Sequence, residues 1–166
     1  TFPGPELPGV DLVLPDVQFA QANLARVKGI VITHAHEDHY GALLDIWPKL
    51  KVPCWMTPFS AGLLEAKRMS EPGAPKNVPI TIYKAGETFQ VGPFSIEAMP
   101  VAHSIPEPMS LAITCGAGTF IHTGDWKIDP APSVGPKTDE ARFRALGDNG
   151  VIALICDSTN ALREGE

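Results

Sequence analysis

The sequence predicts an α/β fold in which strands of mixed direction form a sheet layer that faces helices. Short apolar runs of strand length recur along the 166 residues, and segments with helical spacing lie between some of them. One pair of runs flanks C-G-A-G at 115–118, a hairpin signal. The chain is 44% hydrophobic and 19% charged, which is the composition of a globular chain.

The first part of the chain is expected to alternate helices with short strands. A piece at 10–14 is interpreted as extended, and the run 29–33 as a buried strand. The remaining elements predicted here are helices at 20–27, 40–50 and 60–69 and a strand at 52–56. Gly29 ends the first helix, and Asp38 lies near the entry of the second.

The second part is expected to be rich in strands after a Pro/Gly loop at 71–79. Phe94, Ile96 and Ala98 alternate with more polar residues, as in a half-buried strand. The elements predicted here are strands at 80–83, 88–91 and 94–98, hairpin strands at 110–114 and 119–122, a helix at 138–146 and a buried final strand at 151–156.

Net charge and cysteine usage restrict the function. The net charge of −6 argues against a free-standing nucleic-acid binder but not against a nuclease, because metal cations can supply local positive charge. No apolar run approaches the length of a membrane span, and no secretory signal is found, so no membrane partner is expected. Cys54, Cys115 and Cys156 form no C-x-x-C pair, and we interpret all three as buried strand residues in a reducing cytoplasm.

The stretch T-H-A-H-E-D-H at 33–39 follows a strand-like run and predicts a metal site. In extended backbone His34 and His36 point to the same side and can hold one ion. Where the chain turns into the next helix, Asp38 and His39 can hold a second. Glu37 points away from His36, and we interpret it as a solvated acid or one that contacts the ligands.

Two residues far along the chain can complete this site. His103 lies at a strand end before a proline-rich loop, and Asp125 follows a strand where Gly124 permits a sharp turn. Imidazole and carboxylate together suit zinc, or a harder ion such as manganese. His122 is interpreted as a core residue or one that hydrogen-bonds a ligand. Trp126 is expected to line the site or to pack.

The pattern H-x-H-x-D-H with a distant His and Asp resembles the metallo-β-lactamase superfamily. The resemblance implies an αββα sandwich with mixed sheets flanked by helices, present here as an incomplete fragment. It implies two zinc ions, with the ligands His34, His36, Asp38, His39, His103 and Asp125. His34, His36 and His103 would hold one ion. Asp38 and His39 would hold the other, and Asp125 would bridge them, so that both acids take part in catalysis.

Longer stretches resemble the ribonuclease J family of the β-CASP branch. They are K-G-I-V-I-T-H-A-H-E-D-H-Y-G-A-L, V-A-H-S-I-P-E-P, I-H-T-G-D-W-K-I-D-P and C-D-S-T-N-A. This implies a cytoplasmic homo-oligomer, a dimer or tetramer, that cuts RNA as a 5′-to-3′ exonuclease and endonuclease with a metal-activated water. Asp157 matches a further acidic motif of that branch. It could instead start a turn with Ser158 and Asn160.

Relative to that family, residues 1–166 are expected to be a partial metallo-β-lactamase domain. An early aspartate-bearing motif is not found, and the β-CASP domain would follow after about residue 160. We therefore expect the isolated chain to be inactive. Two other readings stay open from the sequence: a hydrolase of a small ester or thioester, and a non-catalytic module.

Overall fold

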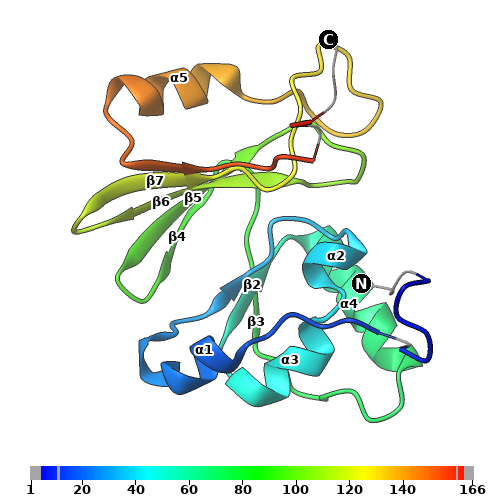
Figure 1. Ribbon diagram of the computed structural model, residues 1–166. Coiled ribbons are helices and arrows are strands. Elements are labelled where there is room, and N and C mark those ends of the chain that lie inside the picture. Colours follow the sequence, from blue (N-terminus) through cyan, green and yellow to red (C-terminus); the bar gives the residue numbers. More distant parts are fainter. Residues whose placement is uncertain (1–4, 11, 160, 163–166) are drawn as a thin grey trace. The chain divides into compact units, whose positions relative to one another are not determined.

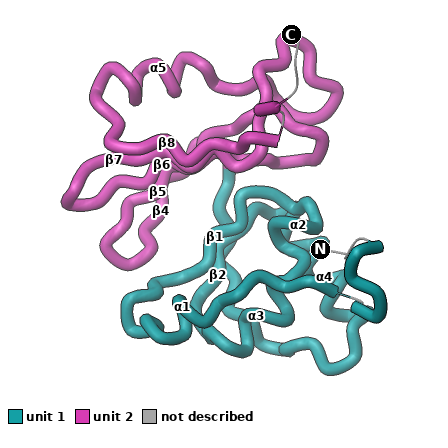
Figure 2. The backbone as a smooth tube through the Cα atoms, viewed as in Figure 1, with its two compact units in different colours: residues 1–84 teal, residues 85–166 magenta. Residues whose placement is uncertain are grey.

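The computed structural model describes residues 5–10, 12–159 and 161–162. The chain divides into two compact units, Thr1–Lys84 and Ala85–Glu166, which Figure 2 shows in different colours. Among the described residues, no helix is long and apolar enough to cross a membrane.

Unit 1 is built on a three-stranded parallel sheet. Its strands are β1 (Ile30–Val31), β2 (Cys54–Met56) and β3 (Ile80–Ile82), in that order. Parallel neighbours need crossover connections, and helices supply them. The helices of the unit are α1 (Gln18–Ala22), the 3₁₀ turn η1 (Leu24–Arg26), α2 (Glu37–Tyr40), α3 (Leu43–Leu50) and α4 (Pro58–Ser70).

Local sequence explains where α4 begins and what unit 1 buries. The Thr57 hydroxyl accepts the amide of Ser60 at 3.4 Å, and Pro58 occupies the first turn, where its missing N–H costs nothing. Leu64 of α4 is buried, as are both end residues of strand β2. Burial raises the pKa of the Cys54 thiol to about 11, so this thiol is a packing group and not a nucleophile.

Unit 2 is a five-stranded mixed sheet with a helix on one face (Figure 1). The strands are β4 (Thr88–Val91), β5 (Phe94–Pro100), β6 (Met109–Cys115), β7 (Gly118–His122) and β8 (Ala153–Ile155). All neighbours are antiparallel except β7 and β8, which are parallel. Helix α5 (Glu140–Asp148) buries Leu146 against Met99, Ala112 and Ile121 of the sheet.

The predicted α/β class with mixed sheets is confirmed, and so is the hairpin formed by β6 and β7. Several boundaries were wrong. The helix predicted at 40–50 begins later, as α3 at Leu43, and Tyr40 is the last residue of α2; Gly41 and Ala42 lie between the two helices. The helix predicted at 20–27 is replaced by α1 and η1. Residues 10 and 12–14 belong to no helix or strand, and Asp11 lies outside the described residues.

Burial was predicted wrongly for two strands and two cysteines. Strand β1 is half-buried, and β8 is exposed, with Leu154 at 58% exposure. Cys54 is buried as predicted, but Cys115 is half-buried and Cys156 is exposed. An apolar run indicates a strand, but its burial depends on which elements cover its faces, and that information is not local.

Candidate metal centre

The histidine loop of unit 1 has the local shape that the sequence predicts. Strand β1 ends at Val31, and residues 32–36 have no regular structure. His36 has extended backbone, and its carbonyl accepts the amides of His39 at 2.9 Å and Tyr40 at 3.1 Å. The chain therefore turns into α2 directly after His36. This turn separates the histidines of the extended stretch from Asp38 and His39 of the helix.

Three imidazole rings gather in this loop. The ring centroid of His34 lies 4.9 Å from that of His36 and 4.1 Å from that of His39. One donor atom of His34 and one of His36 lie within 4.8 Å of each other, and the same holds for Asp38 and His39. Each pair can therefore approach a common ion with small movements of the side chains.

His34 is fully buried and contacts a buried hydroxyl. Its Nδ1 lies 3.1 Å from the Thr33 Oγ1, and either atom can donate. Metal-bound histidines commonly use one ring nitrogen for the ion and the other for a hydrogen bond that fixes the ring. Thr33 is in position to do this for His34, and sequence reasoning did not single it out.

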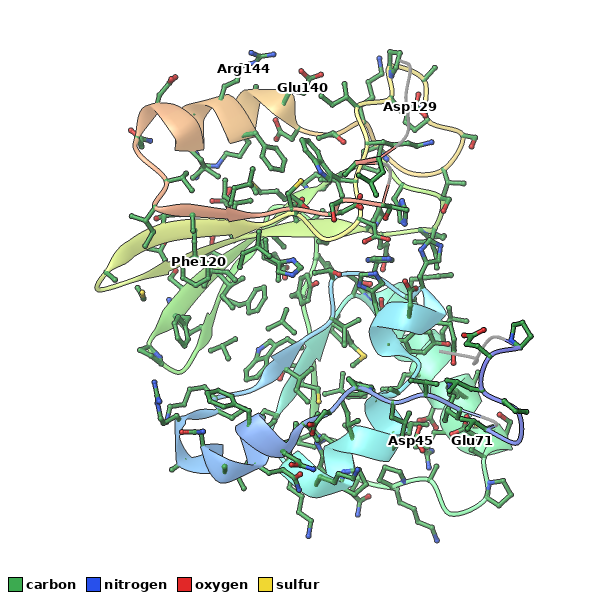
Figure 3. The ribbon with its side chains drawn as sticks, viewed as in Figure 1. Asp45, Glu71, Phe120, Asp129, Glu140 and Arg144 are labelled. Atoms are coloured by element: carbon green, nitrogen blue, oxygen red, sulfur yellow. The ribbon has the colours of Figure 1, made fainter. Side chains whose placement is uncertain are left out.

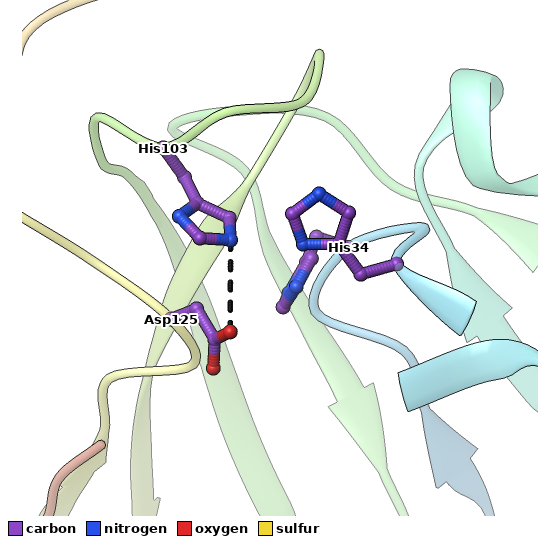
Figure 4. A group of neighbouring side chains, drawn as sticks. His34, His103 and Asp125 are labelled. Carbon is purple, nitrogen blue, oxygen red and sulfur yellow. Dashed lines mark ion pairs between the residues drawn. The ribbon is translucent and has the colours of Figure 1, made fainter. Parts of the chain in front are cut away.

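Unit 2 carries the other two predicted ligands side by side. His103 Nε2 lies 3.6 Å from Asp125 Oδ2. Figure 4 marks this contact with a dashed line. The two strand ends are joined by the isolated bridge between Ala102 and Lys127. The hydroxyl of Thr138 accepts the amide of Ala102 at 2.9 Å and donates to the Lys127 carbonyl at 2.7 Å. Thr138 thus fixes the backbone beside both ligands.

The turn that presents Asp125 depends on Gly124 and His122. Gly124 has a φ of +59°, which glycine adopts without strain, as the sequence predicted. Its amide donates to His122 Nδ1 at 3.1 Å. Thr123, between them, is buried. Its hydroxyl accepts a hydrogen bond from the Asp157 amide at 3.2 Å and donates one to the Gly124 carbonyl at 2.7 Å. His122 therefore supports the turn next to a candidate ligand.

Asp157 is tied into a turn of its own. Its Oδ1 accepts the amide and the hydroxyl of Thr159, both at 2.7 Å. The Thr159 amide, and next its hydroxyl, hold the pKa of the Asp157 carboxyl below its usual range. A turn starting at Asp157 was the alternative that the sequence left open, and the structure forms it with Thr159. Asn160 lies outside the described residues.

The remaining aromatic candidate packs. The ring of Trp126 stacks on Phe143 of α5, with centroids 5.3 Å apart.

The candidate ligands are of the kind that zinc and related divalent ions use: imidazole nitrogens with carboxylate oxygens, on short loops at strand ends. The residues of each unit therefore fit a divalent ion chemically.

Comparison with known proteins identifies the class. A family described as "Beta-lactamase superfamily domain" matches residues 3–145. The chain therefore belongs to the β-lactamase superfamily. A solved metallo-β-lactamase of Cronobacter sakazakii, a motif mutant, is similar with a TM-score of 0.56 and 18% identity, over 82% of this chain and 60% of that chain. This likeness shows the metallo-β-lactamase fold.

Within that class the chain is similar to ribonuclease J. It is 64% identical to ribonuclease J of Sinorhizobium meliloti, over 99% of this chain and 29% of the relative. Ribonuclease J of Mycolicibacterium smegmatis is 41% identical, again over 99% of this chain and 29% of the relative. The chain thus spans less than a third of the length of these relatives.

Proposed function

We propose that the protein to which this chain belongs is a metal-dependent hydrolase of RNA, a ribonuclease of the ribonuclease J type. The observation that carries the proposal is the H-x-H-x-D-H loop, with three imidazoles within contact distance, in a chain 64% identical to a ribonuclease J. On this proposal residues 1–166 are part of a metallo-β-lactamase domain. The β-CASP domain and the rest of the fold lie elsewhere in the protein.

The proposed ligands are those that the resemblance to the metallo-β-lactamase superfamily implies. One divalent ion would be held by His34, His36 and His103 and a second by Asp38 and His39, with Asp125 as a further ligand. Zinc is the first candidate and manganese the second. Bound there, two ions would lower the pKa of water to about 7 and stabilise negative charge on the phosphate.

The chain's own residues orient these groups. The Thr33 hydroxyl fixes the His34 ring, Thr138 fixes the backbone next to His103, and His122 supports the turn of Asp125. The acids at 38 and 125 are proposed to take part in catalysis as ligands. Asp157 is proposed to lie near the substrate, held by Thr159 in one orientation with its carboxyl ionised at neutral pH.

The finer features are proposed from the resemblance to the ribonuclease J family. We assign 5′-to-3′ exonuclease and endonuclease activity on RNA, a cytoplasmic location and a homo-oligomeric assembly. The ligand residues alone are also compatible with hydrolysis of a small ester or thioester. What favours RNA is the high identity to ribonuclease J along almost the whole chain.

The test uses the full-length protein, 5′-monophosphorylated single-stranded RNA and a thioester as competing substrate. His36→Ala combined with Asp38→Ala should lower RNA cleavage by about 1000-fold, because both ions lose a ligand. Arg68→Met is the control and should cleave at the wild-type rate, because Arg68 pairs with Glu65 of the same helix. Intact RNA cleavage in the double variant, or thioester hydrolysis without RNA cleavage in the wild type, would refute the proposal.

A further inference from the structure

Glu37 is the charged residue of the H-x-H-x-D-H loop that the ligand set leaves out, and its partner lies far along the chain. Its Oε1 accepts a hydrogen bond from Nζ of Lys67, 30 residues later in helix α4. Both residues belong to unit 1. The pair therefore links the loop that carries four candidate ligands to the longest helix of the unit.

The surroundings of Lys67 hold its ammonium group in place. The side chain is only 18% exposed, whereas that of Glu37 is 49% exposed. A second carboxylate oxygen, from Glu71, lies 3.7 Å from Nζ, and the ring centroid of Tyr40 lies 5.8 Å away. Burial by itself lowers the pKa of Lys67, but the hydrogen bond and charge of Glu37, with smaller contributions from Glu71 and Tyr40, raise it overall.

Gly41 leaves the space that this pair needs. A Cβ atom at Gly41 would collide with the carbonyl of Glu37 and with its carboxylate. The backbone of Gly41 is helical, with φ of −59°, so the glycine is explained by this close approach and not by an unusual turn. Two independent observations therefore concern one contact: a partly buried cation that reaches the Glu37 carboxylate, and a glycine that makes room for it.

Helix α2 needs such an external contact. It has four residues, and a single turn has almost no stability of its own in water. Asp38, with 60% of its side chain exposed, and His39 both lie on this turn. Since Glu37 is the first residue of α2, an anchor at Glu37 restricts the positions of both residues.

We propose that Lys67 is a positioning residue, which through Glu37 holds helix α2 so that Asp38 and His39 are arranged for a divalent ion before the ion binds. The inference rests on the proposed function only in taking Asp38 and His39 as ligands. Lys67 touches no proposed ligand, substrate or ion in this role. An ordinary surface ion pair would behave differently, because its loss would change the melting temperature and leave the metal affinity unchanged.

The experiment measures zinc affinity in the full-length protein by competition with a chromophoric chelator, together with the melting temperature of the metal-free protein. Lys67→Met and Glu37→Gln should each weaken binding of the ion held by Asp38 and His39 by about 10- to 100-fold. Loss of a residue that orients metal ligands has an effect of this size. Lys67→Arg keeps the charge and should stay close to wild type. Combining Lys67→Met with Glu37→Gln changes nothing further if the two residues act as one pair, so the double variant should match either single variant.

Arg68→Met is the matched control. Arg68 is the next residue of α4, and it pairs with Glu65 on the same helix, away from the loop. This variant should bind zinc like wild type. Wild-type zinc affinity in Lys67→Met and Glu37→Gln, or equal weakening by Arg68→Met, would overturn the inference. A wild-type protein that binds no zinc would overturn it and the proposed metal centre together. If the variants show the expected zinc affinities but the wild-type protein does not cleave RNA, only the proposed function is refuted.

Discussion

The guanidinium of Arg142 holds both carboxylate oxygens of Glu97, with Nε–Oε1 and Nη2–Oε2 distances of 2.7 Å each. The pair joins helix α5 to strand β5 across sequence positions 45 residues apart. Two parallel charge-assisted bonds fix direction as well as distance. The pair therefore helps to set how α5 lies on the sheet of unit 2.

Arg142→Met should lower the free energy of opening of α5 by about 1 kcal/mol, the upper part of the range for partly exposed ion pairs. Hydrogen exchange of the α5 amides, followed by mass spectrometry, measures this quantity. Arg144→Met is the control, because Arg144 and Glu140 pair on the side of α5 that points away from the sheet (Figure 3). Equal effects of the two substitutions would contradict the structural role of Arg142.

Thr138 offers a second test in unit 2. Thr138→Val leaves the buried amide of Ala102 without its acceptor and the Lys127 carbonyl without its donor. We expect a loss of about 1–3 kcal/mol in the opening free energy of the surrounding strands, and weaker zinc binding, because the backbone beside His103 loosens. Thr138→Ser keeps the hydroxyl and should cost less than about 1 kcal/mol. The idea fails if the serine variant is as unstable as the valine variant.

The lowered pKa of Asp157 predicts how the stability of the fold changes with pH. The folded state favours the ionised carboxylate, so its contribution to stability is fully present above the ordinary pKa of an aspartate. That contribution is lost as the pH falls through the lower folded-state pKa. Thr159→Val removes the hydroxyl donor and keeps the amide donor. The Asp157 pKa should then rise part of the way towards its usual value.

A carboxyl-carbon NMR titration of the metal-free protein reads this pKa directly. Thr119→Val is a suitable control, because it also removes a threonine hydroxyl but one that bonds to Thr114 at 2.8 Å in the hairpin. An Asp157 titration midpoint that is the same in wild type and Thr159→Val would show that the hydroxyl does not lower the pKa.

Sequence reasoning found the parts of the candidate site that are encoded locally. The spacing of His34 and His36 and the turn into α2 follow from neighbouring residues, and Gly124 marks the sharp turn before Asp125. Lys67 was missed because it looks like an ordinary helical lysine, and its partner lies 30 residues away. Thr138 was missed for the same reason, since its role depends on two strand ends that only the fold brings next to it.

The errors in the fold have a related cause. The run ending in Cys156 is apolar enough for a buried strand, yet β8 is exposed in the structure. Local residues determine the tendency to form a strand, whereas exposure depends on what packs on each face. Likewise, the helical pattern is broken at Gly41 and Ala42, between α2 and α3, although the spacing of apolar residues would have continued it.

Donors of both units are proposed to bind metal ions in the full-length protein. The most direct measurement is the number of zinc or manganese ions per chain, determined by elemental mass spectrometry after equilibration in a metal buffer. About two ions per chain are expected in the wild type. A clear loss is expected in His34→Ala, which changes unit 1, and also in His103→Ala, which changes unit 2. Metal content that is unaffected by either substitution would contradict the proposed metal centre.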